Sequence, residues 1–136
     1  MNQNHVLRVG IIGTGWIAEK AAITLAGVNA CECYAVASRT QEKADAFAAK
    51  WGIVHAYGQY SDLIADKDVD LIYVATPHSH HFDVTREALL AGKPCLVEKA
   101  FMANHAQALE IVRLARERNI FLAETIYPLQ PPVVKR

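Results

Sequence analysis

The sequence predicts an α/β fold in which helices cover both faces of a doubly wound parallel sheet of six strands. Three observations predict it. Short apolar runs alternate with helix-like segments along the chain, a glycine turn follows the first run, and the run at 69–75 is nearly all apolar. Such a run is typical of a central parallel strand covered on both faces. With right-handed crossovers, we expect the strand order 3-2-1-4-5-6.

The composition is that of one folded domain. The chain of 136 residues is 52% hydrophobic and 21% charged, and we assign residues 1–127 to a single domain. The 14 basic and 14 acidic residues balance and form no basic stripe, which argues against nucleic acid and membrane surfaces as partners. The chain starts without the basic and apolar segments of a signal peptide, and no apolar run approaches the roughly 18 residues of a membrane span. We therefore expect a cytoplasmic protein.

The first half of the chain alternates strands and helices, expected at 6–12, 16–25, 31–37, 41–50, 53–57 and 61–64. An apolar face that repeats at i, i+3, i+4 and i+7 indicates the helix at 41–50. That face consists of Ala44, Phe47, Ala48 and Trp51. Gly52 follows it, as glycine commonly follows the last helical residue. Ser61 is expected to cap the short third helix.

The second half continues the alternation, with elements expected at 69–75, 80–91, 95–97, 104–118 and 120–126. Pro77 stops the fourth strand, because proline cannot donate to a sheet ladder. Asn104 and Gln107 have the spacing of a capping box that opens the last helix. Residues 128–136 hold three of the five prolines and are expected to begin a linker to a second domain.

The three cysteines, Cys31, Cys33 and Cys95, are expected to be ordinary buried thiols. An odd number without a secretory signal argues against a disulfide framework. The spacing of Cys31 and Cys33 is too close for a zinc knuckle. We predict no metal site at these residues.

The glycine turn, Gly13-Thr14-Gly15, is the first candidate site. With Ala18 it follows the pattern G-x-G-x-x-G/A, in which the glycines permit close approach or unusual backbone angles and the last small residue lets the helix pack on the strand. A helix that begins near Trp16 points its free N–H groups at the turn, which suits an anion. The pyrophosphate of a dinucleotide is the usual occupant, although the spacing alone is common.

Ser38-Arg39-Thr40 follows the second strand, where an NAD-binding domain usually carries an acidic residue for the ribose 2′-hydroxyl. A carboxylate would repel a 2′-phosphate, whereas a guanidinium and hydroxyls can hold one. The residues therefore favour NADP, while NAD and a plain surface arginine stay open as alternatives.

The segment from Thr76 to His81 follows the fourth strand and carries three of the six histidines. Imidazole suits zinc or copper, but Asp83 is the one further ligand type at a matching spacing. We favour a loop that faces the nicotinamide end of the cofactor over a metal site. Histidines that are simply on the surface stay open as an alternative.

Glu98-Lys99 follows the fifth strand. A lysine at the carboxyl end of a central strand points into the crevice, and beside a cofactor it can polarise or deprotonate a substrate hydroxyl. Hydride would leave the same carbon for the nicotinamide. An exposed Glu98–Lys99 ion pair is the structural alternative.

Together these motifs resemble the N-terminal domain of the glucose–fructose oxidoreductase/inositol dehydrogenase (Gfo/Idh/MocA) family. The segments that carry the resemblance are 9–18, 36–39, 75–77 with His81, 91–93 and 98–99. Residues 119–124 resemble the dihydrodiol dehydrogenase-like branch in particular. The resemblance implies a Rossmann domain of an oxidoreductase that transfers hydride between NAD(P) and a small-molecule substrate, namely a sugar, polyol or related hydroxyl compound.

The resemblance also implies the roles of individual residues. The cofactor-binding residues are Gly13, Gly15, Trp16 and Ile17 at the pyrophosphate, Ser38 and Arg39 at the adenosine ribose or its phosphate, and Thr76, Pro77, His81 and Glu98 toward the nicotinamide. Lys99 stands in the place of the family's catalytic lysine.

Two features depart from the family's pattern. Ala100 stands where the family has a proline, and without proline a cis peptide bond there would be costly. The chain ends at Arg136, about where the family continues into a second α/β domain, so we expect a truncated product. A non-catalytic NAD(P)-binding module, as a sensor or subunit, and an NAD-dependent glycoside-cleaving relative stay open. So do a homo-oligomer and a separate substrate domain as partners.

Overall fold

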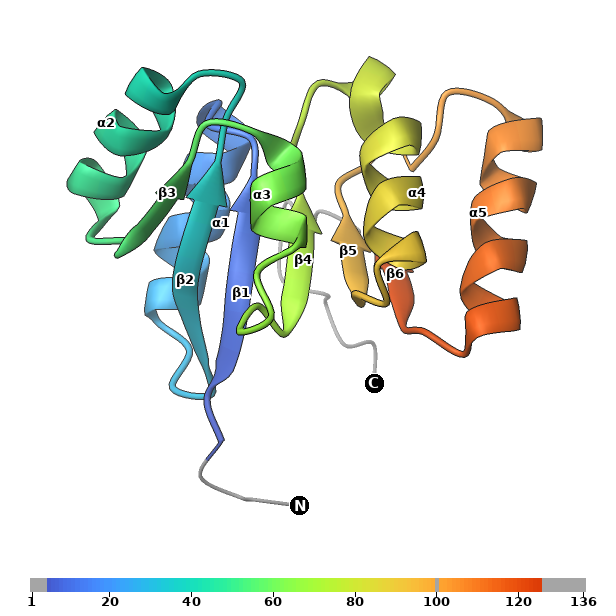
Figure 1. Ribbon diagram of the computed structural model, residues 1–136, viewed down its shortest axis with the longest axis horizontal. Coiled ribbons are helices and arrows are strands. Elements are labelled where there is room, and N and C mark those ends of the chain that lie inside the picture. Colours follow the sequence, from blue (N-terminus) through green and yellow to red (C-terminus); the bar gives the residue numbers. More distant parts are fainter. Residues whose placement is uncertain (1–4, 100, 126–136) are drawn as a thin grey trace, which may run out of the picture.

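Six parallel strands form one sheet in the order β3-β2-β1-β4-β5-β6, which confirms the predicted doubly wound fold (Figure 1). The computed structural model describes residues 5–99 and 101–125. The strands are β1 (Leu7–Ile12), β2 (Cys31–Ala37), β3 (His55–Tyr57), β4 (Leu71–Val74), β5 (Cys95–Val97) and β6 (Leu122–Glu124). The order reverses between β1 and β4, and in such sheets ligands bind beyond the carboxyl ends at this point.

Helices cover the two faces unequally (Figure 1). One face carries α1 (Trp16–Ala26) and α2 (Gln41–Trp51), which pack on β1, β2 and β3. The other face carries α3 (Tyr60–Ile64), α4 (His81–Leu90) and α5 (His105–Arg118). A short 3-10 turn, η1 (His78–His80), leads into α4. The helices α3 and α4 therefore lie across the sheet from α1.

The core explains the continuous apolar runs of the sequence. Neighbouring residues of β1 point to opposite faces, so Ile11 packs with α1 and α2 while Ile12 packs with the helices of the other face. Ile72 and Val74 of β4 are fully buried in that second cluster. Each buried side chain of this size contributes roughly 1.5–3 kcal/mol of hydrophobic stabilisation.

The helix ends confirm the capping predicted at Gly52 and at Asn104. Gly52 adopts the left-handed conformation after α2, and Asn104 Oδ1 accepts a hydrogen bond from Gln107 N at 2.9 Å before α5. The predicted return bond of the capping box is shifted by one residue, since the Gln107 side chain accepts from the N–H of Ala103.

The prediction that Ser61 caps α3 is wrong. The helix begins at Tyr60 with Gln59 as its N-cap, and Ser61 lies in its first turn. Gln59 starts the turn because its carbonyl accepts a hydrogen bond from the N–H of Asp62.

Four strands, β1, β3, β4 and β6, begin one or two residues later than predicted. Ile53 and Val69 are buried but precede β3 and β4, because apolar residues enter the core before the ladder of hydrogen bonds begins. An apolar run therefore reports burial rather than strand length. The expected strand end at Ile126, the linker at 128–136 and Ala100 lie outside the described residues.

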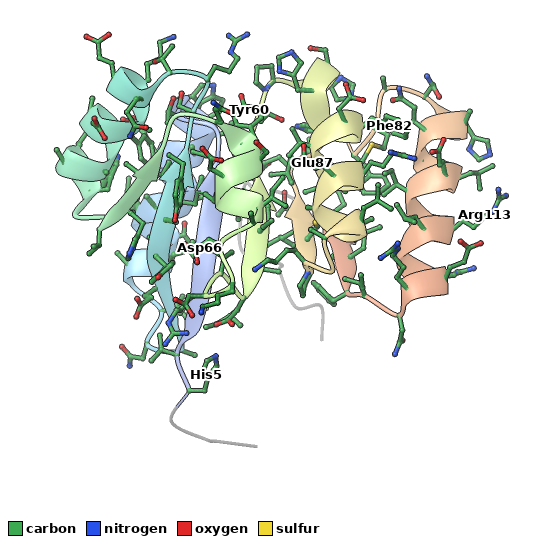
Figure 2. The ribbon with its side chains drawn as sticks, in the orientation of Figure 1. His5, Tyr60, Asp66, Phe82, Glu87 and Arg113 are labelled. Carbon is green, nitrogen blue, oxygen red and sulfur yellow. The ribbon has the colours of Figure 1, made fainter. Side chains whose placement is uncertain are left out.

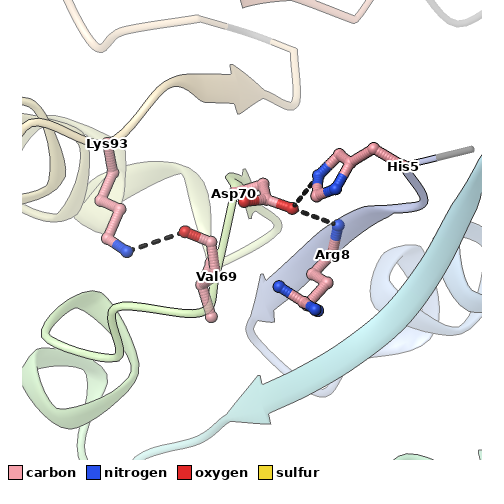
Figure 3. A network of polar contacts seen from close by, with 5 residues as sticks. All are labelled: His5, Arg8, Val69, Asp70 and Lys93. Carbon is pink, nitrogen blue, oxygen red and sulfur yellow. Dashed lines mark hydrogen bonds and ion pairs between the residues drawn. The ribbon is translucent and has the colours of Figure 1, made fainter. Parts of the chain in front are cut away.

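A network of polar contacts closes the amino-terminal edge of the sheet, opposite the edge formed by the carboxyl ends of the strands (Figure 3). The carboxylate of Asp70 accepts a hydrogen bond from Arg8 N at 2.9 Å and lies 3.0 Å from Nε2 of His5. The Nζ of Lys93 donates to Val69 O at 2.7 Å and to Asp66 O at 2.6 Å. These contacts join β1, the segment before β4 and the segment before β5.

The three cysteines are free thiols. Cys95 is buried, as predicted, and burial raises the pKa of its thiol to about 12. Cys31 and Cys33 are only half-buried. Burial raises the pKa of the Cys33 thiol, which keeps that thiol protonated at neutral pH.

No helix within residues 5–99 and 101–125 is long and apolar enough to cross a membrane.

Candidate functional site

A groove of about 660 Å³ runs along the carboxyl ends of β1, β2 and β4. Its walls are the turn at 13–17, residues 38–39, one side of α2, Tyr60 and residues 75–77. It brings together eight residues predicted from the sequence, namely Gly13, Gly15, Trp16, Ile17, Ser38, Arg39, Thr76 and Pro77. The groove therefore lies at the switch point that the strand order defines.

The two glycines of the turn meet different surroundings. Gly13 has a φ of 118°, and a Cβ built there would lie 2.5 Å from Ala75 O, so only glycine fits between the ends of β1 and β4. Gly15 has a φ of −82°, which any residue adopts, and no protein atom lies within 4 Å of its Cβ position. Since Gly15 lines the groove, a side chain there would fill space that a ligand can use.

The first turn of α1 faces the same space. Gly15 is the N-cap and has no side chain to bond the free N–H groups of the helix. Ile17 and the strongly exposed Trp16 extend this wall of the groove. Unpaired N–H groups and the positive end of the helix dipole suit a phosphate. The glycine turn thus has the shape and polarity of a pyrophosphate site.

Polar side chains gather where β2 ends. Ser38 is buried, and its hydroxyl is hydrogen-bonded to that of Thr14 at 3.1 Å, which ties this end of β2 to the glycine turn. Arg39 is exposed at the groove, and Lys43 from the first turn of α2 lies beside it on the same wall. Tyr60 forms the neighbouring wall from the start of α3 (Figure 2). Burial raises the pKa of the Tyr60 hydroxyl, and the nearby Arg39 partly opposes that rise.

The charge of this end of the groove is positive. Glu19, the acidic residue of the wall, is paired with Lys50 at 2.7 Å. Arg39 and Lys43 make no ion pair with any described residue. Two cations therefore remain to meet an anion there.

The loop after β4 supplies a polar atom without a partner. Thr76 is buried, and its hydroxyl makes no hydrogen bond to another described residue although it lies in the groove wall. A buried hydroxyl left unpaired costs roughly 1–3 kcal/mol, so a bound group that pairs with it gains that energy. Together with the open space at Gly15, this hydroxyl fits a polar dinucleotide in the groove.

His81 lies behind this loop rather than in the groove wall. Its ring is 2% exposed, with Nε2 3.0 Å from Thr76 O and Nδ1 3.2 Å from Phe101 O. It thus contacts the loop after β4 and the segment after β5. The neighbouring His78 ring meets it edge-on. No group of three or more histidine, cysteine or acidic side chains that suits a metal ion is found in the described part of the chain.

Glu98 and Lys99 follow the neighbouring strand β5 and do not line the groove. Glu98 is buried, its N–H donates to Val74 O, and its carboxylate accepts a hydrogen bond from the hydroxyl of Tyr73. Lys99 is exposed at the carboxyl edge. The alternative of a Glu98–Lys99 ion pair is not what the structure forms, because the Glu98 carboxylate bonds Tyr73 instead.

Sequence reasoning missed Lys43 and Tyr60. Lys43 lies three residues after the N-cap Thr40, in the first turn of α2, and four residues after Arg39. That spacing was a usable signal that Lys43 and Arg39 lie near each other. Tyr60 reaches the groove from the first position of α3, and nothing in its local sequence indicates this.

Comparison with known proteins agrees with this geometry. The family model described as an oxidoreductase family with an NAD-binding Rossmann fold matches residues 7–125. D-xylose 1-dehydrogenase (NADP⁺) from Hypocrea jecorina is 41% identical, over 90% of this chain and 34% of the relative. Trans-1,2-dihydrobenzene-1,2-diol dehydrogenase from Mus musculus is 38% identical, over 89% of this chain and 37% of the relative.

A solved structure gives the same picture. A 3-ketoreductase from Actinomadura kijaniata, in complex with TDP-benzene and NADP, superimposes with a TM-score of 0.86 at 33% identity. The match covers 91% of this chain and 40% of that one. The chain thus spans little more than a third of the length of the relatives it matches. Its sequence, strand order and groove together show that the chain belongs to the Gfo/Idh/MocA oxidoreductase family with an NAD-binding Rossmann fold.

Proposed function

We propose that this chain is the cofactor-binding domain of an NADP(H)-dependent oxidoreductase. The observation that carries the proposal is the pair of cations, Arg39 and Lys43, at the end of the groove beyond β2. A family member that uses NAD through the ribose hydroxyl needs a carboxylate at that end, and none lies there unpaired among the described residues. Two relatives carry NADP in their names or complexes, which supports the same cofactor here.

The groove accounts for the proposed binding residue by residue. The N–H groups beside Gly13, Gly15, Trp16 and Ile17 would hold the pyrophosphate. Arg39 and Lys43 would pair with a 2′-phosphate, and the Ser38 hydroxyl has lone pairs left for the ribose after its bond to Thr14.

The reactive end of the site is proposed to lie toward β4 and β5. Bound NADP supplies a hydride acceptor, and NADPH a hydride donor. Thr76 and Pro77 would line the nicotinamide side, with His81 supporting them and Glu98 reaching the cofactor ribose. Lys99 would give a proton to, or take one from, the oxygen of the reacting carbon.

The substrate is proposed to be a sugar, polyol or related diol, in keeping with the xylose and dihydrobenzenediol named for the relatives. Residues that select a substrate would come from a domain after residue 127. The chain itself would then bind cofactor but turn over little substrate, because the substrate is not oriented.

Titration of the chain with NADPH and with NADH, followed by nicotinamide fluorescence, tests the proposal. We expect saturable binding of NADPH, tighter than NADH by about tenfold, which is the effect of a charge-assisted contact at an exposed phosphate. Arg39→Ala should bring the two dissociation constants within about twofold of each other, since it removes the guanidinium from the 2′-phosphate.

Arg113→Ala is the matched control, because Arg113 is exposed on α5 away from the groove (Figure 2). It should leave both dissociation constants unchanged. The proposal fails if neither nucleotide shows saturable binding to the wild-type chain. Tighter binding of NADH than NADPH would overturn the role given to Arg39.

A further inference from the structure

We propose that His81 and Glu124 are positioning residues that clamp the backbone of Phe101 and thereby hold Lys99 toward the cofactor groove. The inference rests on the proposed function, because it concerns the placement of Lys99 beside a bound dinucleotide. The contacts of His81 and Glu124 with the C=O and N–H groups of Phe101 together form the Phe101 clamp.

The first half of the Phe101 clamp is a buried imidazole. His81 opens α4, is 2% exposed, and places Nδ1 3.2 Å from Phe101 O. Its Nε2 lies 3.0 Å from Thr76 O. One ring therefore contacts both the loop that carries Thr76 and the segment that follows Lys99. A neutral imidazole carries one N–H, so the ring can donate a hydrogen bond to one of these two carbonyl oxygens at a time while it packs against the other.

The second half is a carboxylate on the opposite side. Phe101 N donates to Glu124 Oε2 at 2.9 Å, and Glu124 is the last residue of β6. The next residue, Thr125, donates its N–H to Val97 O at 2.8 Å, so this end of β6 is itself fixed to β5. A hydrogen bond to a charged carboxylate is stronger than one between neutral groups.

The clamp acts on the segment that connects β5 to α5. Phe101 lies between β5 and α5, outside any helix or strand; its N–H donates to Glu124, and its carbonyl oxygen contacts the ring of His81. Lys99 is two residues earlier and exposed, and Ala100 rather than a proline separates it from Phe101. Side-chain contacts at Phe101, rather than a proline ring at position 100, are thus proposed to restrict the backbone that carries Lys99.

The test measures how well a bound cofactor shields Lys99. Acylation of lysines by an N-hydroxysuccinimide ester, quantified by peptide mass spectrometry, is followed with saturating NADPH, with adenosine 2′,5′-bisphosphate, or with neither. In the wild-type chain NADPH should slow acylation of Lys99, whereas the bisphosphate, which lacks the nicotinamide half, should not. Glu124→Ala should reduce the NADPH protection by about tenfold, the effect of losing one hydrogen bond to a charged group.

Three further variants keep the result interpretable. Glu124→Gln retains an oxygen that accepts from Phe101 N and should keep the protection near wild type. Glu110→Ala removes an exposed carboxylate paired with Arg86 on α4 and should change nothing. His81→Phe should also lose protection. This substitution removes the ring nitrogens that face the carbonyl oxygens of Thr76 and Phe101, so the melting temperature of the variant is measured alongside. If His81→Phe fails to fold, Glu124→Ala decides the question.

The outcomes separate the two proposals. Binding of NADPH with equal protection of Lys99 in Glu124→Ala and wild type overturns the Phe101 clamp and leaves the proposed function standing. Binding of NADPH without protection of Lys99 in the wild-type chain overturns the clamp as well. Failure of the wild-type chain to bind NADPH or the bisphosphate overturns the proposed function, and the clamp with it. Loss of protection in Glu124→Ala and its rescue in Glu124→Gln support the clamp.

Discussion

At the scale of single residues, the glycine turn shows how one motif serves folding and binding at different positions. Gly13 is required by the protein itself, because its backbone is left-handed and its Cα faces the carbonyl of Ala75. Gly15 has ordinary backbone angles and open space before it. The protein itself therefore does not require glycine at this position, whereas a ligand that enters the groove would. The two glycines can therefore be separated by experiment.

Gly13→Ala should lower the free energy of unfolding by more than about 2 kcal/mol, through strain at positive φ and the clash with Ala75 O. Gly15→Asp should leave the melting temperature at or above that of wild type, because aspartate is a favoured N-cap for α1. The same variant should abolish NADPH binding, since its carboxylate fills the groove and repels the pyrophosphate. Thermal unfolding and fluorescence titration measure both effects. Gly15→Asp that still binds NADPH as wild type would refute the role given to this turn.

The residues of the candidate site that directly follow a strand could be predicted from the sequence. Gly13, Ser38 and Thr76 each follow a strand, and the carboxyl ends of neighbouring parallel strands meet at one edge. His81 was expected at the nicotinamide side, but the sequence could not show that its ring turns inward between two carbonyls. That orientation depends on the packing of α4, which no local pattern encodes.

At the scale of elements, β3 and α3 are short, and a side-chain hydrogen bond stabilises the unit that they form. The strand β3 has three residues and the helix α3 five, so neither is stable on its own. The Tyr57 hydroxyl at the end of β3 donates to Asp66 Oδ2, just beyond α3, at 2.7 Å. Figure 2 shows Tyr60 and Asp66 near opposite ends of this helix. This hydrogen bond thus holds α3 in place, and Tyr60, the first residue of α3, lines the groove.

This bond shifts the titration of both partners. The hydrogen bond to Asp66, together with burial, raises the pKa of Tyr57 to about 12. Burial alone would raise the pKa of Asp66, but the hydrogen bonds from Tyr57 and from the N–H of Asp68 lower it below its ordinary 3.8. A lowered acid pKa adds stability above the ordinary value, which is lost as pH falls through the folded pKa. A raised phenol pKa adds stability that is lost as pH rises through 12.

Tyr57→Phe should therefore lower the free energy of unfolding by about 1 kcal/mol at neutral pH. The difference in unfolding free energy from wild type should shrink as the pH falls below 3.8, the ordinary pKa of Asp66. A protonated carboxyl accepts the hydrogen bond from Tyr57 more weakly than the carboxylate does. Urea unfolding at neutral and acidic pH measures it. Tyr34→Phe serves as control, since its hydroxyl lies 3.5 Å from Asp68 in an exposed contact. A difference that stays constant down to pH 3, roughly one unit below the ordinary value, would contradict this coupling.

At the scale of the whole molecule, the topology could be predicted and the walls of the groove only in part. Alternating apolar and helical segments suffice for the order of strands, because crossovers between parallel strands have one favoured hand. The β3–α3 connection brings Tyr60 to the groove and α2 brings Lys43, and both placements follow from how elements pack on the sheet. Sequence periodicity reports which side of a helix is buried, not which neighbour it meets.

The central feature of the molecule is the groove along the carboxyl ends of the strands, which combines positively charged side chains with open space at the glycine turn. The backbone N–H groups of the glycine turn lie at one point of the groove, and Arg39 and Lys43, which form no ion pair with a described residue, lie at one end. The Thr76 hydroxyl, which has no hydrogen-bond partner among the described residues, lies in the wall after β4. Each of these features belongs to a different element. The groove therefore depends on the ends of β1, β2 and β4 together rather than on any single motif.

Mapping of bound NADP⁺ by ¹H–¹⁵N correlation spectra of the labelled chain tests the proposed binding groove most directly. Amide shifts should concentrate at residues 13–17 and 38–43, and NAD⁺ should give smaller changes at 38–43 because it lacks the 2′-phosphate. Unchanged amides at the glycine turn, or shifts centred instead on the far end of α5 and β6, would contradict binding in this groove.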